Sequence, residues 1–239
     1  MSLLVGLTAN AQDKKYYELR TYYTYEGKRP DLIKRFQDHT LKLFKKSGME
    51  NIAYFIPVDE SNQTLIYFLA YPDKASRDKS WNTFMNDPDW KEAQKKSEEN
   101  GKIVSKVDNA FMTKAPELNS KKLKQLGKGD KIFELRTYYC FPGKLGDLNA
   151  RFRDHTQKLF ENHGITNVAY WFTEEKEGNP SHLVYLIAHK NQEAAKASWD
   201  AFRADPEWIK AKDASEANGK IVEKVESIYL KALPFSPLK

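Results

Sequence analysis

Two short stretches of the chain carry the side chains best suited to chemistry, and one repeats the other. The repeated set is a glutamate, an arginine and a tyrosine at alternate positions: Glu18, Arg20 and Tyr22, and then, 116 residues later, Glu134, Arg136 and Tyr138. Alternation places each set on one face of a β-strand. Arginine binds carboxylates and phosphates through paired hydrogen bonds, with glutamate available as a base. The pattern predicts either two ligand-binding faces or two structural ion-pair networks.

His39 and His155 are the second group of candidates, as catalytic residues. Each falls on an apolar stripe with helical spacing, Leu32, Phe36, His39 and Leu43 in one copy and Leu148, Phe152, His155 and Leu159 in the other. A histidine at such a place is a proton shuttle, a haem ligand or a structural residue bonded to the backbone. Neither has a second ligand at short histidine spacing, so the sequence predicts no metal site.

The elements around these residues also occur twice. Hydrophobic alternation predicts strands at 16–23, 51–57, 64–70 and 104–113, with counterparts at 167–173, 183–188 and 222–231 beside the Glu134 strand. A helix is predicted from Pro30 to Ser47, and a second one is broken at Asp87-Pro88, where a new helix begins. Each copy therefore reads β-α-β-β-α-β, the ferredoxin-like arrangement of the α+β class, with helices on one face of an antiparallel sheet.

The hairpin strands are apolar on both faces, as in Ile52, Tyr54 and Ile56 against Ala53 and Phe55. A sheet of this kind needs a second cover. We expect the two sheets to cover each other as a barrel with helices outside, which makes the chain an intramolecular pseudo-dimer. If the Glu18 face lines that barrel, its charges must pair, because an unpaired buried charge is very costly.

The repeats place the two domains at 16–116 and 131–235, joined by a linker at 117–130. Residues 1–12 contain an apolar run and the small-residue pattern Ala9-Asn10-Ala11, which resembles the end of a signal peptide. We therefore expect a periplasmic or secreted protein, with a cytoplasmic one as the alternative. No stretch approaches the length of a transmembrane helix.

Composition excludes several function classes. The formal charge of +6 is spread among acidic residues, so nucleic acid is not an expected partner. The single cysteine, Cys140, excludes an intrachain disulfide and a cysteine-rich metal site, and an inert, partly buried thiol is expected. No phosphate-binding glycine loop or Ser-His-Asp order occurs, and no cofactor is evident.

Three motifs occur in the same order in both copies and carry a resemblance to a known family. In the first copy they are Tyr17-Glu-Leu-Arg-Thr-Tyr22, Phe36-x-Asp38-His39-Thr40 and Trp81-x-x-Phe84-x-x-Asp87-Pro88-x-Trp90. The second copy has Glu134-Leu-Arg-Thr-Tyr138, Phe152-x-Asp154-His155-Thr156 and Trp199-x-x-Phe202-x-x-Asp205-Pro206-x-Trp208. The chain resembles the NIPSNAP family of the dimeric α/β-barrel superfamily over nearly its whole length. The aromatic residues of the third motif are expected in the core.

The resemblance implies a fold more than an activity. The family is associated with protein interaction and with vesicle or mitochondrial roles in eukaryotes, while the wider superfamily includes monooxygenases, dehydratases and haem enzymes. Fold alone does not give function. Our first hypothesis is a protein that binds a small apolar or acidic ligand in a cleft or barrel. The alternatives are a monooxygenase-like or haem-assisted enzyme and an interaction module without catalysis, and further oligomerisation is compatible with each.

Overall fold

The computed structural model describes residues 14–118, 131–176, 178 and 180–239. The predicted signal-like segment 1–12 and most of the predicted linker lie outside this range, so both stay predictions, as does the localisation. In the first half of the chain the strands are β1 (Tyr16–Thr24), β2 (Glu50–Pro57), β3 (Thr64–Tyr71) and β4 (Val104–Lys114). The helices are α1 (Arg29–Arg35), the π-helical turn η1 (Phe36–Thr40), α2 (Leu41–Lys46), α3 (Lys74–Asn86) and α4 (Pro88–Ser97).

The second half repeats this order element by element. Its strands are β5 (Ile132–Cys140), β6 (Thr166–Thr173), β7 (Leu183–His189) and β8 (Val222–Ala232). Its helices are α5 (Leu145–Arg151), the π-helical turn η3 (Phe152–Thr156), α6 (Gln157–Asn162), α7 (Gln192–Ala204) and α8 (Pro206–Ser215). The predicted β-α-β-β-α-β order is confirmed for both halves.

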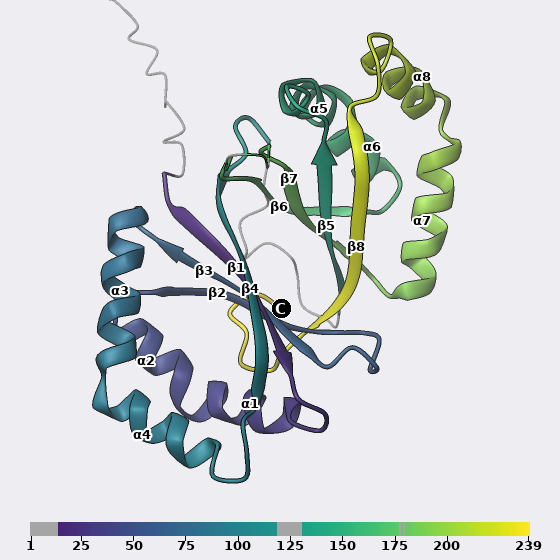
Figure 1. The fold of residues 1–239 in the computed structure, drawn as a ribbon. Helices are drawn as coiled ribbons and strands as arrows, with labels where there is room; N and C mark the ends of the chain where they lie inside the picture. The colour runs from purple at the N-terminus through teal and green to yellow at the C-terminus, as the bar shows by residue number, and fades with distance from the viewer. Residues whose placement is uncertain (1–13, 119–130, 177, 179) are drawn as a thin grey trace, which may run out of the picture.

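The eight strands form one closed antiparallel barrel in the order β1-β3-β2-β8-β5-β7-β6-β4. Each half contributes one four-stranded sheet, and the helices lie on its outer side (Figure 1). The halves join through two short pairings, Phe55–Pro57 of β2 with Leu230–Ala232 of β8, and Met112–Lys114 of β4 with Trp171–Thr173 of β6. The intramolecular pseudo-dimeric barrel expected from the apolar hairpins is confirmed.

The Glu18 face of β1 does not line the barrel, and the opposite face of the strand does. Leu19, Thr21 and Tyr23 point into the barrel, where they line a cavity. Glu18 points outward, under α3, and bonds to Trp81 of that helix. The charged face is thus covered by helices and not by the opposite sheet. The pattern of charges in the sequence could not show whether the helices or the opposite sheet pack on this face, because both are low-dielectric environments.

The first helix departs from the predicted stripe at its centre. In η1 the backbone N–H of Leu41 bonds to the carbonyl of Phe36, five residues earlier, which inserts one extra residue into the turn. Thr40 therefore takes the inward place and is 1% exposed, while His39 is only partly buried. In the second half Thr156 is likewise buried and His155 is exposed. The prediction that both histidines lie on the apolar stripe is wrong by one residue.

Local signals at the later helices are confirmed. Asp73 accepts a hydrogen bond from the N–H of Ser76 and caps α3, and Asp87 accepts one from the N–H of Asp89 and caps α4. Pro88 then occupies the first turn, where its missing N–H costs nothing. The second half uses Asn191 and Asp205 in the same way. The break at Asp-Pro bends the helical layer around the outside of the sheet.

The apolar core has three parts. One cluster fills the barrel and includes stacked and tilted aromatic rings of Tyr17, Phe55, Phe68, Phe133 and Trp171. The other two lie between each sheet and its helices. The aromatic residues of the third motif pack there, with Phe84, Trp90, Trp199 and Phe202 between 2% and 7% exposed. Among the described residues no helix has the length and apolarity needed to cross a membrane.

Candidate functional site

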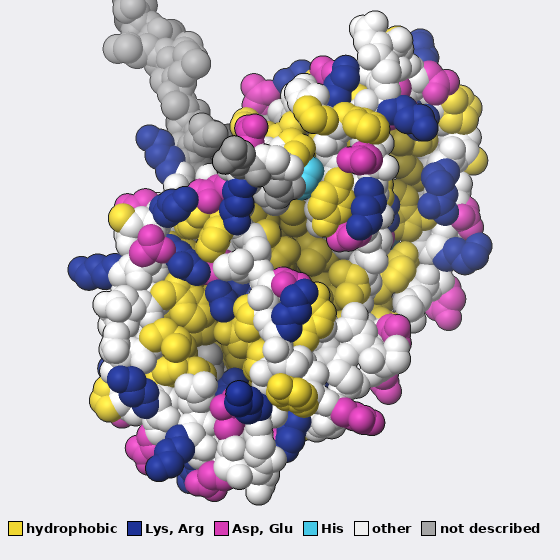
Figure 2. Space-filling view, in the orientation of Figure 1, with side chains coloured by type: hydrophobic (Ala, Val, Ile, Leu, Met, Phe, Trp, Pro, Cys, Tyr) yellow, Lys and Arg dark blue, Asp and Glu magenta, His cyan; other side chains and the backbone are white. Residues whose placement is uncertain are grey.

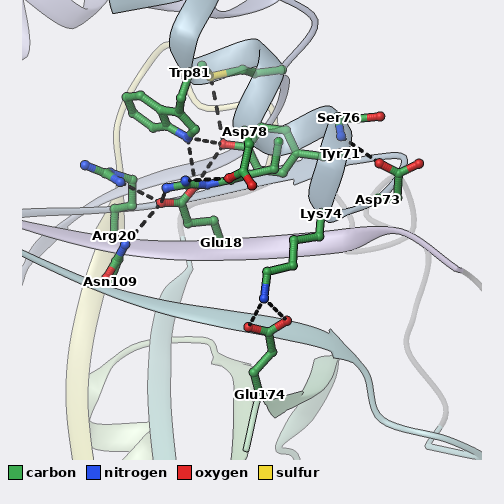
Figure 3. A network of polar contacts seen from close by, with 12 residues as sticks. Glu18, Arg20, Tyr71, Asp73, Lys74, Ser76, Asp78, Trp81, Asn109 and Glu174 are labelled. Carbon is green, nitrogen blue, oxygen red and sulfur yellow. Dashed lines mark hydrogen bonds and ion pairs between the residues drawn. The ribbon is translucent and has the colours of Figure 1, made fainter. Parts of the chain in front are cut away.

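Glu18 is the centre of the polar network in the first half (Figure 3). Its side chain is fully buried, and its carboxylate accepts a hydrogen bond from Nη1 of Arg20 at 2.6 Å. Arg77 of α3 adds two bonds, from Nη2 at 2.9 Å and from Nε at 3.1 Å. Two arginines therefore pair with one glutamate in this half. This is the paired geometry that a buried charge requires.

Neutral donors complete the Glu18 network. The indole N–H of Trp81 and the hydroxyl of Tyr71 each donate to Oε2 at 2.9 Å. The guanidinium of Arg20 lies over the Trp81 ring, 4.3 Å from its centroid. A carboxylate accepts about four hydrogen bonds, so these donors and the arginines occupy its capacity. The network holds β1 to β3 and α3.

The second half builds its network around Glu134 with different partners. Arg136 donates to Oε1 at 2.5 Å, as does the hydroxyl of Ser227. Trp199 donates to Oε2 at 2.7 Å, and Nε2 of His189 lies 3.0 Å from the same oxygen. Ala195 stands where the first half has Arg77, by the repeat shift of 118. The second network therefore contains one arginine instead of two.

Both buried glutamates are ionised. Burial would raise the pKa of Glu18, but the hydrogen bond from Arg77 and the charge of Arg20 lower it to about 2. Burial opposes ionisation of Glu134 too, and there the bond with His189 and the charge of Arg136 lower the pKa to about 2. A carboxylate with such a pKa is a poor base at neutral pH. The geometry therefore favours the structural alternative for both glutamate–arginine sets.

The predicted histidines lie apart from these networks. His39 is in η1 and His155 in η3, and neither is among the residues that bond to Glu18 or Glu134 or that line the cavity described next. Tyr22 and Tyr138 do join the predicted sets, with hydroxyls 3.4 Å and 3.5 Å from the arginines of their own strands. The structure brings the glutamates, arginines and tyrosines together but not the histidines.

A cavity of about 760 Å³ opens in the barrel between the two halves. Its floor is apolar and rests on the aromatic cluster of the barrel core, with Leu19, Leu135 and Ile228 in contact with both. Thr21 and Thr137 form the next level. The space-filling view shows hydrophobic side chains in a central hollow of the molecule (Figure 2). Because strands rise about 3.3 Å per residue, the floor lies about 13 Å along the strand from Tyr23.

The mouth of the cavity is polar. Tyr139 donates to Glu226 at 2.7 Å, and Lys224 lies 2.5 Å from the same carboxylate. In the other half Lys106 lies 2.8 Å from Asp108, beside Tyr23. Hydrogen bonds from these lysines lower the pKa of both carboxyl groups, and those from the tyrosines lower it further.

His182 is a wall residue that the two halves do not share, since Thr64 occupies its place in the first half. The ring Nδ1 of His182 accepts the backbone N–H of Cys140 at 3.2 Å, so the ring proton is on Nε2. Burial lowers the pKa of His182, which favours the neutral ring. Cys140 itself is buried, and burial raises the pKa of its thiol to about 11, as expected for an inert thiol.

Sequence reasoning missed the cavity residues because it followed the charged face of β1. The signal was present in the alternation that places Leu19, Thr21 and Tyr23 on one face, repeated by Leu135, Thr137 and Tyr139. What the alternation does not give is the inward or outward direction of that face. Within the described ranges, no group of three or more histidine, cysteine, aspartate or glutamate side chains is arranged to hold a metal ion.

Solved structures share the fold at low sequence identity. An anthrone oxidase-like protein has a TM-score of 0.60 and 15% identity, with 95% of each chain covered. A Fusobacterium nucleatum protein named as a proposed monooxygenase has a TM-score of 0.58 and 10% identity, with 92% of each chain covered. A similar protein from Lactobacillus acidophilus has a TM-score of 0.55 and 12% identity, covering 92% of this chain and 94% of that one. At these identities the likeness shows the fold alone.

No curated protein matches the chain. The NIPSNAP family model matches it twice, at residues 17–118 and 133–237, and so covers most of its length. These two segments coincide with the two sheets and their helices, and each contains one buried glutamate network. The chain belongs to the NIPSNAP family and contains two tandem copies of the family's domain.

Proposed function

We propose that this protein binds a small, mainly apolar ligand in the barrel cavity between its two halves. The observation that carries the proposal is the cavity itself, about 760 Å³ with an apolar floor and polar groups at the mouth. Cavities of this size and lining are typical of sites for small molecules. Because both halves contribute to one space, we expect one ligand per chain.

Of the two ligand classes expected from the sequence, the lining supports the apolar one. The lining carboxylates Asp108, Glu174 and Glu226 are paired with Lys106, Lys74 and Lys224, so these lysines already have carboxylate partners within the chain. The arginines that were candidates for binding an acid are paired with Glu18 and Glu134 under the helices. An acidic ligand therefore has little support from this site.

The two alternatives have weaker support. The enzyme alternative relies on His39 or His155 with Arg20 or Arg136, and these groups lie in different places in the structure. Solved structures named as an anthrone oxidase-like protein and as a proposed monooxygenase share the fold of this chain. This likeness identifies no residue here that could carry out a reaction. An interaction module without a small-molecule site would have an exposed aromatic patch and no pocket, whereas the motif aromatics pack into the core and a cavity is present.

A neutral fluorescent probe of apolar surfaces, N-phenyl-1-naphthylamine, tests the proposal. We expect saturable binding with one site per chain, measured by the rise in probe fluorescence. The double variant Leu19→Trp/Leu135→Trp fills the floor from both halves and should weaken binding by more than tenfold, because the probe loses the apolar space it occupies.

The control is Ile209→Trp, which adds an indole on the outer helix α8 at a side chain that is 47% exposed. It should leave probe binding unchanged. Thermal unfolding of all variants separates lost binding from lost folding. Unchanged binding by a folded Leu19→Trp/Leu135→Trp variant would place the probe elsewhere and overturn the proposal.

A further inference from the structure

The mouth of the cavity carries the same three groups from each half, which we call the mouth triads. They are a tyrosine, a carboxylate and a lysine: Tyr23, Asp108 and Lys106 in one half, and Tyr139, Glu226 and Lys224 in the other. The tyrosines and carboxylates line the cavity. The lysines stand outside its lining, with side chains that are each 62% exposed.

Each triad already binds an ammonium group of the chain. Nζ of Lys106 lies 2.8 Å from Oδ2 of Asp108 and 4.9 Å from the centroid of the Tyr23 ring. Nζ of Lys224 lies 2.5 Å from Oε1 of Glu226 and 5.2 Å from the centroid of the Tyr139 ring. A carboxylate beside the face of an aromatic ring is a suitable environment for an ammonium group.

The lysines leave each triad able to bind a further cation. Pairs between half-exposed charges are weak, because water competes for both partners, so a second cation can share or replace the lysine. Each carboxylate also accepts more hydrogen bonds than the lysine and the tyrosine supply. The third carboxylate of the lining, Glu174, is paired with Lys74 of α3 at 3.2 Å, which leaves Asp108 and Glu226 as the carboxylates beside aromatic rings at the mouth.

The two triads lie across one opening. Tyr23 comes from β1 of the first half and Glu226 from β8 of the second, yet the charge of Glu226 contributes to the raised pKa of the Tyr23 hydroxyl. Burial is the main cause of that rise, followed by the hydrogen bond with Asp108. Because the tyrosines and carboxylates of both triads line one cavity, a single ligand head group at its mouth would interact with both carboxylates.

We propose that the ligand is an amphipathic amine, whose ammonium head lies between the mouth triads and whose apolar body rests on the leucine and isoleucine floor. This inference depends on the proposed function and adds the class of ligand to it. An alkyl or aryl amine combines the two chemistries that the cavity offers at its two ends. The charge of the head remains at the wet mouth, so it does not bear the cost of full burial.

Three probes of equal chain length test the inference: n-decylamine, n-decanol and decanoate. Each is measured by displacement of N-phenyl-1-naphthylamine at neutral pH and low salt, below the concentration at which it forms micelles. We expect the amine to bind roughly tenfold more tightly than the alcohol, and decanoate to bind most weakly. Added salt should reduce the advantage of the amine, because the carboxylates are partly exposed.

The double variant Asp108→Asn/Glu226→Gln should reduce amine binding to the level of the alcohol and leave alcohol binding within twofold. The matched control Glu193→Gln/Asp200→Asn removes the same two charges from the outer helix α7, where Asp200 pairs with Lys196. It should preserve the preference for the amine. Circular dichroism shows whether each variant is folded.

The outcomes separate the inference from the proposed function. If wild-type protein binds decanol as tightly as decylamine, the amine inference is overturned while the apolar cavity stands. An amine preference that survives in a folded Asp108→Asn/Glu226→Gln variant also overturns it. If neither the alcohol nor the amine displaces the probe, the proposed function itself is wrong.

Discussion

The two halves of the barrel hold the same buried glutamate with different sets of partners. In the first half Glu18 has Arg20, Arg77, Tyr71 and Trp81. In the second half Glu134 has Arg136, His189, Trp199 and Ser227. The arginine two residues along the strand and the tryptophan on the helix are common to both, and Asn109, 3.5 Å from Oε1 of Glu18, occupies the place that Ser227 has in the second half.

The comparison shows what the site needs and what it tolerates. Both glutamates reach a pKa of about 2 even though one network has two arginines and the other has one. The hydrogen bonds from His189 and Ser227 therefore do in the second half much of what Arg77 does in the first. Both halves require hydrogen-bond donors for the buried carboxylate, but different residues can supply them.

The largest expected difference between the halves follows removal of the glutamates. Glu18→Ala leaves two arginines in the buried network without their partner, and we expect it to lower the free energy of unfolding by about 3–5 kcal/mol. Glu134→Ala leaves one arginine, so its cost should be smaller by about 1 kcal/mol. Urea unfolding followed by tryptophan fluorescence measures both. Equal losses would show that the count of arginines does not decide the cost.

Acid titration probes what the two networks share. Both glutamates have a folded pKa of about 2, below the ordinary value of 4.5. A lowered pKa gives stability that is present above the ordinary pKa and is lost as the pH falls through the folded one. Each glutamate should therefore contribute about 3 kcal/mol to the free energy of unfolding at neutral pH. This contribution is lost as the pH falls from about 4.5 to about 2.

The check is the free energy of unfolding measured from pH 7 to pH 2, for the wild type and for Glu18→Gln and Glu134→Gln. Each variant should show a shallower loss in this range, since one of the two titrating groups is gone. If either variant follows the wild-type slope, the acid sensitivity comes from other carboxyl groups. Asp200→Asn, at a side chain that is 52% exposed, serves as the comparison for a surface carboxylate.

Much of the fold could be predicted from the sequence because its signals are local and appear twice. Strand alternation, the Asp-Pro caps and the two-sided apolar hairpins gave the element order and the barrel. The π-helical turns were missed, since the predicted stripe assumed 3.6 residues per turn throughout. One inserted residue was enough to move Thr40 inward and His39 outward.

The site was less predictable because it depends on contacts between distant strands. The pairs of Glu18 with Arg20 and of Glu134 with Arg136 were predictable, since the partners are two residues apart. Arg77 and His189 reach those glutamates through α3 and β7, and nothing in their local sequence marks them. Asp108 and Glu226 meet at one cavity only because the sheets close into a barrel.

The smallest expected effect sharpens the comparison most directly. Arg77→Ala gives the first half the residue that the second half has as Ala195. Glu18 keeps Arg20, Tyr71 and Trp81 but loses two charged hydrogen bonds, at 2.9 Å and 3.1 Å. We expect the free energy of unfolding to fall by about 1–3 kcal/mol, which is less than for Glu18→Ala because the carboxylate stays partnered. Arg203→Ala, at a side chain that is 61% exposed, is the control and should change it by less than about 0.5 kcal/mol.

The double variant Arg77→Ala/Tyr71→His makes the comparison complete, because His189 is the residue that the second half has in place of Tyr71. If the imidazole serves Glu18 as it serves Glu134, the histidine should restore part of the stability lost by Arg77→Ala. A double variant less stable than Arg77→Ala would mean that the two backbones position this residue differently. The two networks would then be separate solutions that only share a glutamate, and the partners of one could not be transferred to the other.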